Sequence, residues 1–525
     1  MDNRSTFPLA WPVAAKRACA AAPGAAPRSR PLAFALAIAL GSAGGTAAAT
    51  PAPMPNATFA GHAGDVAAPP RTQGALLWPV ENCNDAGTGS LRYVAAHAAD
   101  GDGIDLSSLT CSTISVTSGA ITLGDVDLAG PGADALTIDG AGNQGRRIFD
   151  HVGHGGSLTI RDVTVHGAKY ESDAGKGGAC LRSDDGQLHV YDSVFDGCLA
   201  FAPTGTSGAV RGGAIAAYGS YVTLSHVTLS NNQARSANGD ALGGALYVSG
   251  RTLISRSTIS NNSATAAGSA AVRRGGGVFA HDSAVFWYST LDGNLSQGIG
   301  GGALVEGGAG LMFSTVSNNT ASGGGSGIAV LGARGSSSAF ADVFASTISG
   351  NVTEASTQSG TGALYANTEV TTILGSTIAG NVEWNVQGIA WGAGILFGPA
   401  AGSGVTMVST IVHGNRLRDT TVGTDIGGPL GATLAGDHNL IGSALVYLPA
   451  DTIRSSDPLL GPLQDNGGPT LTRMPATDSP VIDSGNAQSQ VYDQREYPRV
   501  VGLAADIGAV EVQSTDVIFA DDFDG

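Results

Sequence analysis

A repeated motif constrains the fold of this chain more than any other feature. Its fullest form is Ser-Thr-Ile-Ser-x-Asn, and a glycine pair followed by a small and an apolar residue, as in GGAI from residue 212, keeps step with it. Two markers that share one period of about 31 residues indicate a solenoid in which each repeat forms one coil. Successive copies start 30, 34, 30, 32, 25, 32, 30 and 33 residues apart, at Thr164, Val194, Thr228, Thr258, Thr290, Thr315, Thr347, Thr377 and Thr410.

Each repeat holds short runs in which apolar and small polar residues alternate, as in 245–248 and 252–254, without a helical period. Proline is absent from residue 204 to residue 398, as expected where nearly every backbone N–H donates to a neighbouring strand. Equivalent strands of successive coils would pair in parallel, and parallel crossovers are almost always right-handed. We therefore predict an all-β fold, a single-stranded right-handed parallel β-helix whose coils stack about 4.8 Å apart.

An asparagine closes most copies of the motif. Identical asparagine side chains in successive coils can hydrogen-bond along the stack, so we interpret them as a structural ladder rather than as ligand contacts. We predict that the glycine pairs take a positive φ or a tight bend at a strand entrance, and that they do not cradle a phosphate. The ladder asparagines are Asn232, Asn262, Asn294, Asn319, Asn351, Asn381 and Asn415, and Cys198 takes this position in its own coil.

Composition and charge exclude several classes of protein. Glycine supplies 79 of 525 residues, but it does not recur at every third position, so the chain is not collagen-like. Hydrophobic residues make up 42% and charged residues 13%, which excludes a charge-rich disordered chain. The formal net charge is −17 and no basic stripe is present, so we expect no nucleic acid partner.

Residues 1–49 have the layout of a secretory signal peptide. Basic residues precede nine apolar ones at 32–40, and a small-residue stretch with Ala47-Ala48-Ala49 follows. Nine apolar residues are too few for the rival interpretation, a membrane anchor, which needs about 20. Loss of the leader removes five basic residues and one acidic residue, which leaves a net charge of −21. We expect a monomer that is secreted or held on the outer surface, with no transmembrane span in the mature chain.

The mature chain divides by composition into five parts. Ser90 is a suitable N-cap for an amphipathic helix over 90–99, which we expect to cover the N-terminal end of the core. Residues 416–513 lose the repeat and regain proline, which favours an irregular C-terminal cap. The expected parts are a flexible linker (50–80), an N-terminal cap with the first coils (81–150), the repeats (151–415), a C-terminal module (416–513) and an acidic tail (514–525).

Four cysteines remain after removal of the leader. An even number in an exported protein suggests disulfides, and closeness in sequence favours Cys83 with Cys111 and Cys180 with Cys198. A metal site is the rival interpretation, but the chain has no CxxC motif and no histidine at ligand spacing to these cysteines.

Several segments resemble known families of secreted proteins. NCNDAGTGSLRYVAAHAADGDGIDLSSLTC (82–111) resembles the N-terminal block of the CSLREA group, and the repeats resemble those of polymorphic outer-membrane proteins and of the pectin-lyase-like β-helix superfamily. DHNLIG (437–442), DPLLGPLQDNGGPTLTRMPATDSPVIDSGN (457–486) and DQREYPRVVGLAADIGAVE (493–511) resemble the choice-of-anchor Q domain, although Glu496 stands where that pattern usually has glycine. The resemblance implies export and a β-helix, in families whose molecular activity is mostly unassigned.

Our first functional hypothesis is a non-catalytic surface or extracellular protein that is adhesin-like or envelope-associated. Loops that vary in length at one turn of each coil fall along one edge of the stack, where they can contact a glycan or the cell envelope. The candidate loops are 233–242, 263–274 and 382–392, and their candidate contact residues are Arg235, Arg273, Arg274, Trp384 and Trp391. The two tryptophans can stack on sugar rings or, as we favour, pack between loops.

The second hypothesis is a polysaccharide lyase or glycoside hydrolase that acts on acidic polysaccharides. Hydrolysis needs two carboxylates across a groove, and Asp184-Asp185 is the adjacent pair within the repeats, although we expect it in a solvated turn. The motifs of polygalacturonases are incomplete, because the GHG at 153–155 precedes the acidic pair and RIK is absent. The remaining catalytic candidates, His151, His154 and His166, form a local basic cluster with Arg146, Arg147 and Arg161.

We expect no cofactor. The run from Asp100 to Asp105 resembles half of a calcium loop but lacks the closing glutamate, and a turn after the cap helix explains it. A lyase of this class would need a basic residue beside acidic calcium ligands, and the mature chain keeps two lysines, Lys169 and Lys176. We therefore favour a non-enzymatic protein.

Overall fold

The structure, a computed structural model, describes residues 75–513 except 143–144, 173–175, 207, 220, 269–271, 333–338, 355–361, 385–391, 402–403, 419–423, 430 and 455. All described residues belong to one compact unit, Phe59–Gly525. The expected signal peptide, most of the linker and the acidic tail lie outside the described residues.

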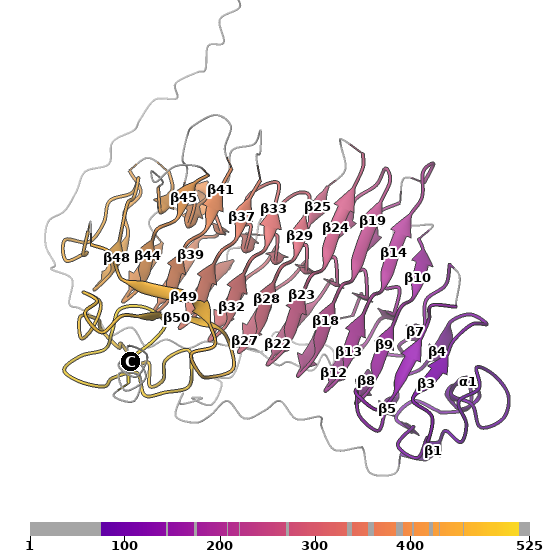
Figure 1. Cartoon of the computed structure of the whole chain (residues 1–525). Helices are drawn as coiled ribbons and strands as arrows, with labels where there is room; N and C mark the ends of the chain where they lie inside the picture. Colours follow the sequence, from indigo (N-terminus) through magenta and orange to yellow (C-terminus); the bar gives the residue numbers. More distant parts are fainter. Residues whose placement is uncertain are drawn as a thin grey trace, which may run out of the picture. The chain divides into compact units, whose positions relative to one another are not determined.

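The chain winds repeatedly through the same series of strands (Figure 1). In one coil, β16 (Ile215–Ala217) lies in sheet C, β17 (Tyr221–Ser225) in sheet A, β18 (Thr228–Ser230) in sheet B and β19 (Gln233–Ser236) in sheet D. The next coil returns to sheet C with β21 (Leu246–Val248), which pairs in parallel with β16 and places Leu246 opposite Ile215. The predicted right-handed parallel β-helix is confirmed.

Each sheet extends along the stack, with one strand from each coil. In the described part of the chain, sheets A, B, C and D contain 13, 12, 11 and 9 strands, and the short sheet E contains three. The first and last strands are β1 (Leu77–Pro79) and β47 (Ala435–Asp437) in sheet A, β3 (Thr113–Ser115) and β48 (Leu440–Ile441) in sheet B, β4 (Ile121–Leu123) and β46 (Ile426–Gly427) in sheet C, and β10 (Lys169–Glu171) and β45 (Arg416–Leu417) in sheet D. Sheet E consists of β15 (Val210–Arg211), β20 (Ala241–Leu242) and β25 (Arg273–Arg274).

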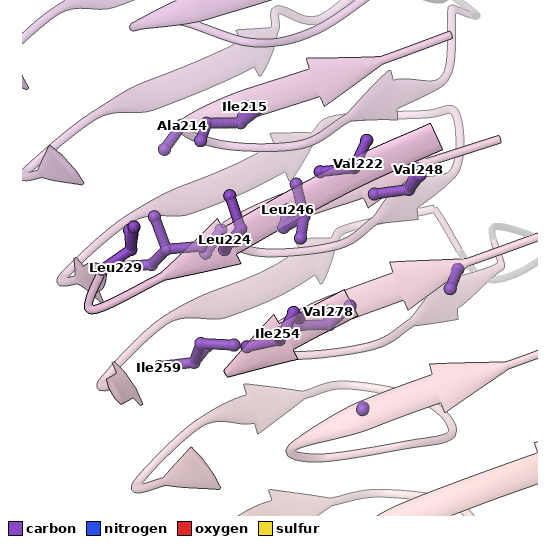
Figure 2. Packing of buried hydrophobic residues seen from close by; sticks show 14 of the residues in the cluster. Ala214, Ile215, Val222, Leu224, Leu229, Leu246, Val248, Ile254, Ile259 and Val278 are labelled. Carbon is purple, nitrogen blue, oxygen red and sulfur yellow. The ribbon is translucent and has the colours of Figure 1, made fainter. Parts of the chain in front are cut away.

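Alternation within the strands builds the core. Because successive side chains of a strand point to opposite faces, one residue in two enters the solenoid, where equal positions of successive coils stack in columns. Leu224 lies opposite Ile254 in sheet A, and Leu229 lies opposite Ile259 in sheet B. Figure 2 shows these side chains packed between the sheets with Leu246 and Val278 of sheet C.

The asparagine column is a continuous hydrogen-bonded ladder. Asn262 Nδ2 donates to Asn294 Oδ1 at 2.9 Å and to the Leu229 carbonyl at 2.9 Å, and its backbone N–H donates to the same Asn294 oxygen at 3.0 Å. The ladder begins at Cys198, whose N–H donates to Asn232 Oδ1, and ends at Asn415, which donates twice to Asp425 Oδ1. The glycine markers take a positive φ, as predicted, for example +67° at Gly212 and +71° at Gly243.

A second ladder, which the sequence analysis did not predict, runs along the corner between sheets A and B. Ser289 N–H donates to Ser314 Oγ, and Ser314 N–H donates to Ser346 Oγ. In the last coil of this ladder Thr410 replaces the serine: Ser376 N–H donates to the Thr410 hydroxyl, and Ile411, not Thr410, lies opposite Thr377. Our sequence alignment, which matched Thr410 with Thr377, was therefore wrong by one residue. Thr410 instead matches Ser376, because either hydroxyl can fill the buried corner.

The N-terminal cap helix, α1 (Leu91–Ala95), is shorter than the predicted 90–99. Ser90 is its N-cap, as predicted, and accepts a hydrogen bond from Tyr93 N–H. The Ala99 N–H donates to Asp102 Oδ2 instead of to a helix carbonyl, so the helix does not extend to residue 99. None of the helices in the described part of the chain has the length and apolar composition needed to cross a bilayer.

The parallel coils continue beyond the expected boundary at residue 415. Strand β48 still pairs with β44 (Ile411–His413), with Leu440 opposite Ile411, although the repeat motif is lost. Residues 456–513 then fold back along the outer face of sheet B. This segment is shorter than the C-terminal module of 416–513 expected from the sequence, and from here on the name is used for 456–513. Gln494 accepts a hydrogen bond from the Thr347 hydroxyl at 2.6 Å and donates to Thr315 Oγ1 at 3.0 Å.

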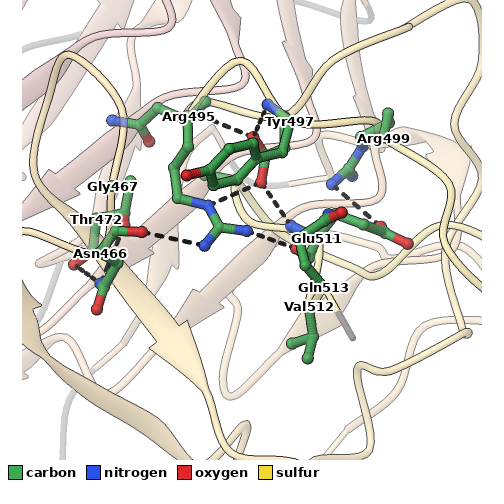
Figure 3. A network of polar contacts seen from close by, with 12 residues as sticks. Asn466, Gly467, Thr472, Arg495, Tyr497, Arg499, Glu511, Val512 and Gln513 are labelled. Carbon is green, nitrogen blue, oxygen red and sulfur yellow. Dashed lines mark hydrogen bonds and ion pairs between the residues drawn. The ribbon is translucent and has the colours of Figure 1, made fainter. Parts of the chain in front are cut away.

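The C-terminal module contains a network of buried charged side chains (Figure 3). Arg495 Nε lies 3.0 Å from Asp493 Oδ2, and its Nη2 donates to the Glu511 carbonyl at 2.6 Å. The Glu511 carboxylate accepts the N–H groups of Val501 and Asp506, both at 2.7 Å. Charged hydrogen bonds thus hold the module together beside a small apolar cluster, in which Val481 and Ile507 pack on Ile411 and Leu440.

Both predicted disulfides are present. Cys83 is bonded to Cys111 beside the cap helix, with their Cα atoms 6.5 Å apart. Cys180 is bonded to Cys198 at the start of the asparagine ladder, with their Cα atoms 5.9 Å apart.

Candidate functional site

Three turns at the N-terminal end of the solenoid bring two aspartates and a histidine together. Asp100 precedes β2 (Gly103–Asp105), Asp125 precedes β5 (Asp127–Ala129) and His154 precedes β8 (Ser157–Arg161), so each comes from a different coil. His154 Nδ1 lies 2.8 Å from Asp100 Oδ2, and the His154 N–H donates to Asp125 Oδ2 at 3.0 Å. One ligand atom from each of the three lies within 4.8 Å of the others, close enough to hold a metal ion.

His151 lies directly behind this group, inside the solenoid. Its Nε2 is 3.0 Å from Asp125 Oδ1 and its Nδ1 is 2.7 Å from Ser183 Oγ. Burial lowers the pKa of His151, and Asp125 offsets this only in part. Burial raises the pKa of Asp125, but hydrogen bonds from His154 N–H, His151 and Gly156 N–H outweigh it and leave the pKa below its usual value.

The Asp125, His151 and Ser183 side chains have the residue types of a catalytic triad, but not its accessibility. All three are buried, and His151 and Ser183 face each other across neighbouring strands, β7 (Phe149–Val152) and β11 (Leu181–Asp184). A nucleophilic hydroxyl must reach a substrate, and Ser183 is inside the core. We interpret this trio as a satisfied buried hydrogen-bond network.

The predicted basic cluster is not assembled. His166 pairs with Asp196 at 3.2 Å on the outer face of sheet B. Arg161 pairs with Asp127, and Arg147 donates to the Gly177 and Gly178 carbonyls. These residues are close in sequence, but the chain turns between them, so they lie on different faces of the solenoid. His151 and His154 remain together.

The Asp184-Asp185 pair is also separated. Asp184 ends β11, whereas Asp185 is exposed in the following turn with a φ of +63°. Arg182 forms ion pairs with Asp184 and, at 3.5 Å, with Asp150 of β7. The structure thus pairs Asp184 with Asp150, a residue that the sequence analysis did not select.

Further along the same sheet, one outward column is aromatic and apolar. Tyr247, Phe279 and Leu304 lie opposite one another in β21, β26 (Val278–Ala280) and β30 (Ala303–Val305). The rings of Tyr247 and Phe279 stack with centroids 5.4 Å apart and an interplanar angle of 4°, and Tyr218 lies 5.4 Å from Tyr247. These side chains form a hydrophobic cluster separate from the solenoid core.

Charged side chains border this column. Arg211 lies over the Tyr247 ring at 5.6 Å, and Arg274 Nη1 is 2.5 Å from Glu306 Oε1. Both arginines come from sheet E, which lies between the loop edge and sheet C. The sheet C strip, as we call it, consists of Arg211, Tyr218, Tyr247, Arg274, Phe279, Leu304 and Tyr365.

The strip contains one of the predicted contact residues, Arg274. Arg273 instead donates to the Ala266 carbonyl and fastens its own loop. Arg235 is exposed on sheet D, and the Trp384 ring is covered by the Arg418 guanidinium at 3.5 Å. Trp391 lies outside the described residues. Tyr247, Phe279 and Tyr365 were missed although each directly follows a glycine marker, and that spacing was the signal that pointed to them.

A sequence-family model described as the right-handed β-helix region matches residues 148–340. The chain is a right-handed parallel β-helix protein. The matched segment contains most of the strip, whereas Asp100 and Asp125 of this β-helix precede it. No curated protein sequence matches the chain.

Proposed function

We propose that this β-helix protein is an exported, non-catalytic surface or extracellular protein that binds glycans along the sheet C strip. The observation that carries the proposal is the aromatic column bordered by two arginines. Tyr247 and Phe279 are almost fully buried and form its floor, while Tyr218, Tyr365, Arg211 and Arg274 keep part of their surface exposed.

The chemistry of the strip suits a sugar chain. Tyrosine rings offer an apolar face to the C–H side of a pyranose and a hydroxyl to its polar rim. Arginine binds a carboxylate through two parallel N–H groups, which favours uronic acids. Because the strip lies across successive coils, it can contact several sugar units of one chain.

Export is supported by the signal-like leader and by the two disulfides, which persist in oxidising compartments. The test is the mass of the mature protein recovered from the culture medium or cell surface. A mature chain that begins near residue 50 supports export, and an intact N-terminus inside the cell contradicts it.

Binding is tested by passing the purified chain over immobilised pectins, alginates and glycosaminoglycans. We expect retention on one glycan class, and at least fivefold weaker binding for Arg274→Gln and for Tyr365→Ala. The control is Arg251→Gln, on the outer face of sheet A. Absence of retention, or an equal loss in the control, contradicts the proposal.

The second candidate is a glycoside hydrolase or lyase, favoured by one observation. Asp150 and Asp184 are two carboxylates that share the Arg182 guanidinium on the outer face of sheet C, the same face as the strip, and Asp150 also pairs with Arg147 at 3.5 Å. The glycan panel is therefore also followed for new reducing ends and for absorbance from unsaturated products. Turnover that is lost in Asp150→Asn and Asp184→Asn makes the protein an enzyme, and turnover that persists excludes these two residues.

A further inference from the structure

The N-terminal group of Asp100, Asp125 and His154 combines ligand types from three coils. These residues are 25 and 29 positions apart, so the contact exists only because the first coils stack in this register. Asp125 is buried, while the side chains of Asp100 and His154 are 46% and 64% exposed. The group therefore has one fixed member and two that can adjust, and it is open to solvent on one side.

In the described part of the chain, histidines rather than arginines or lysines face the negative charge of this group. Among the described residues, the side chains that pair with the Asp100 or Asp125 carboxylate are His151 and His154. Neither carboxylate pairs with an arginine or a lysine of the described chain. Two carboxylates within a few ångströms repel each other, and a divalent cation between them removes that repulsion.

Asp125 is oriented before any ligand arrives. His151 holds one of its oxygens, and the N–H groups of His154 and Gly156 hold the other at 3.0 and 2.9 Å. This histidine-to-carboxylate contact is the kind that orients the ligands of metal sites. A Cβ at Gly156 would lie 2.7 Å from Asp125 Oδ2, and one at Gly124 would lie 2.7 Å from Asp100 Oδ1, so a side chain at either position would displace these oxygens.

We propose that Asp100, Asp125 and His154 form a binding site for a divalent metal ion of the kind that accepts an imidazole ligand, with zinc preferred over calcium. Calcium favours oxygen ligands alone, whereas zinc combines a histidine nitrogen with carboxylates. Ligand atoms around a tetrahedral zinc lie about 3.3 Å apart. The three ligand atoms here lie within 4.8 Å of one another, so small movements of the exposed Asp100 and His154 side chains bring them to this distance. The ion takes the place of the hydrogen bond between His154 Nδ1 and Asp100 Oδ2, and the neutral imidazole then carries its proton on Nε2. This site is independent of the proposed glycan binding.

The experiment is calorimetric titration of the purified, tag-free full-length chain with zinc chloride and, separately, with calcium chloride, after treatment with a chelator. We expect one zinc ion per chain, with binding at least tenfold weaker in His154→Gln and in Asp100→Asn. His281→Gln is the matched control, because His281 is also 64% exposed and also meets a carboxylate, that of Glu306, through Nδ1. Its zinc affinity should stay within twofold of the wild type.

Each outcome decides the proposal. Stoichiometric zinc binding that is lost in the two site variants and kept in the control supports it. Absence of saturable zinc binding, equal affinity in all variants, or tighter binding of calcium than of zinc overturns it. Thermal unfolding of the metal-free proteins is the check on folding, and because both substituted side chains are largely exposed, we expect the melting temperatures to agree.

Discussion

Glu496 Oε1 lies 3.0 Å from Arg256 Nη2 and joins the C-terminal module to the corner between sheets A and B across 240 residues of sequence. Glu496 has a φ of +70°, a conformation that favours glycine. The choice-of-anchor Q pattern, which this segment resembles, usually has glycine at this position. We interpret the ion pair as compensation for the strained backbone of a side chain at this position.

The first prediction separates these two effects. Glu496→Ala keeps the positive φ and loses the ion pair, so we expect the free energy of unfolding to fall by about 0.5–1 kcal/mol. Glu496→Gly also loses the pair but relieves about 1 kcal/mol of backbone strain, so its stability should match the wild type. Urea unfolding of both variants is the measurement. If the glycine variant is no more stable than the alanine variant, the strain is absent.

The second prediction concerns the asparagine ladder. Asn294→Ala removes four buried hydrogen bonds and leaves the Asn262 N–H without an acceptor, so we expect a loss of about 2–4 kcal/mol of unfolding free energy. Gln233→Ala, an exposed residue directly after Asn232, should change stability by less than about 0.5 kcal/mol. Equal effects of the two substitutions in urea unfolding would show that the ladder adds no stability.

The third prediction is a fall in stability as the pH rises. Burial raises the pKa of Glu511 to about 7 from its ordinary 4.5, against hydrogen bonds from the Asp506 and Val501 N–H groups. The folded state therefore holds a proton that the unfolded state releases between about pH 4.5 and 7, and stability falls across this window by roughly 1–3 kcal/mol. Glu511→Gln, which does not titrate, should flatten this slope, and the exposed Glu171→Gln should leave it unchanged. A slope that is identical in all three proteins contradicts the assignment.

The fourth prediction tests how the C-terminal module is attached. Gln494 is buried and bonds to Thr315 and Thr347 of sheet B, so Gln494→Ala should loosen the module on the solenoid while the coils stay folded. Hydrogen exchange should increase by at least tenfold within 456–513 and stay unchanged in the earlier coils. Thr347→Val should have the same effect, and Thr258→Val, an exposed residue of the same column, should have none. Uniform exchange in all variants would show that other contacts hold the module.

The solenoid was predictable because its information is local and repeated. Parallel coils in constant register place residues at equivalent repeat positions in columns, so the motif alone predicts both the strands and the asparagine ladder. Closeness in sequence predicts the two disulfides. The serine ladder and the displaced Thr410 were missed because several small polar residues adjoin each other in the motif, and sequence spacing does not tell which of them faces the corner.

The sites depend on contacts that have no period. Asp100, Asp125 and His154 meet because the first coils stack on one another, and these coils carry no motif from which the contact could be predicted. Asp150, which shares Arg182 with Asp184, lies one coil away rather than next in sequence. The C-terminal module binds the side of the solenoid through Gln494, at a distance of 147 residues from Thr347. The amino-acid sequence alone thus determined the β-helix and its asparagine ladder, because repetition encodes them coil by coil. The tertiary structure alone decided which charged and aromatic side chains share a surface, because that depends on how each coil turns and on what later packs against it.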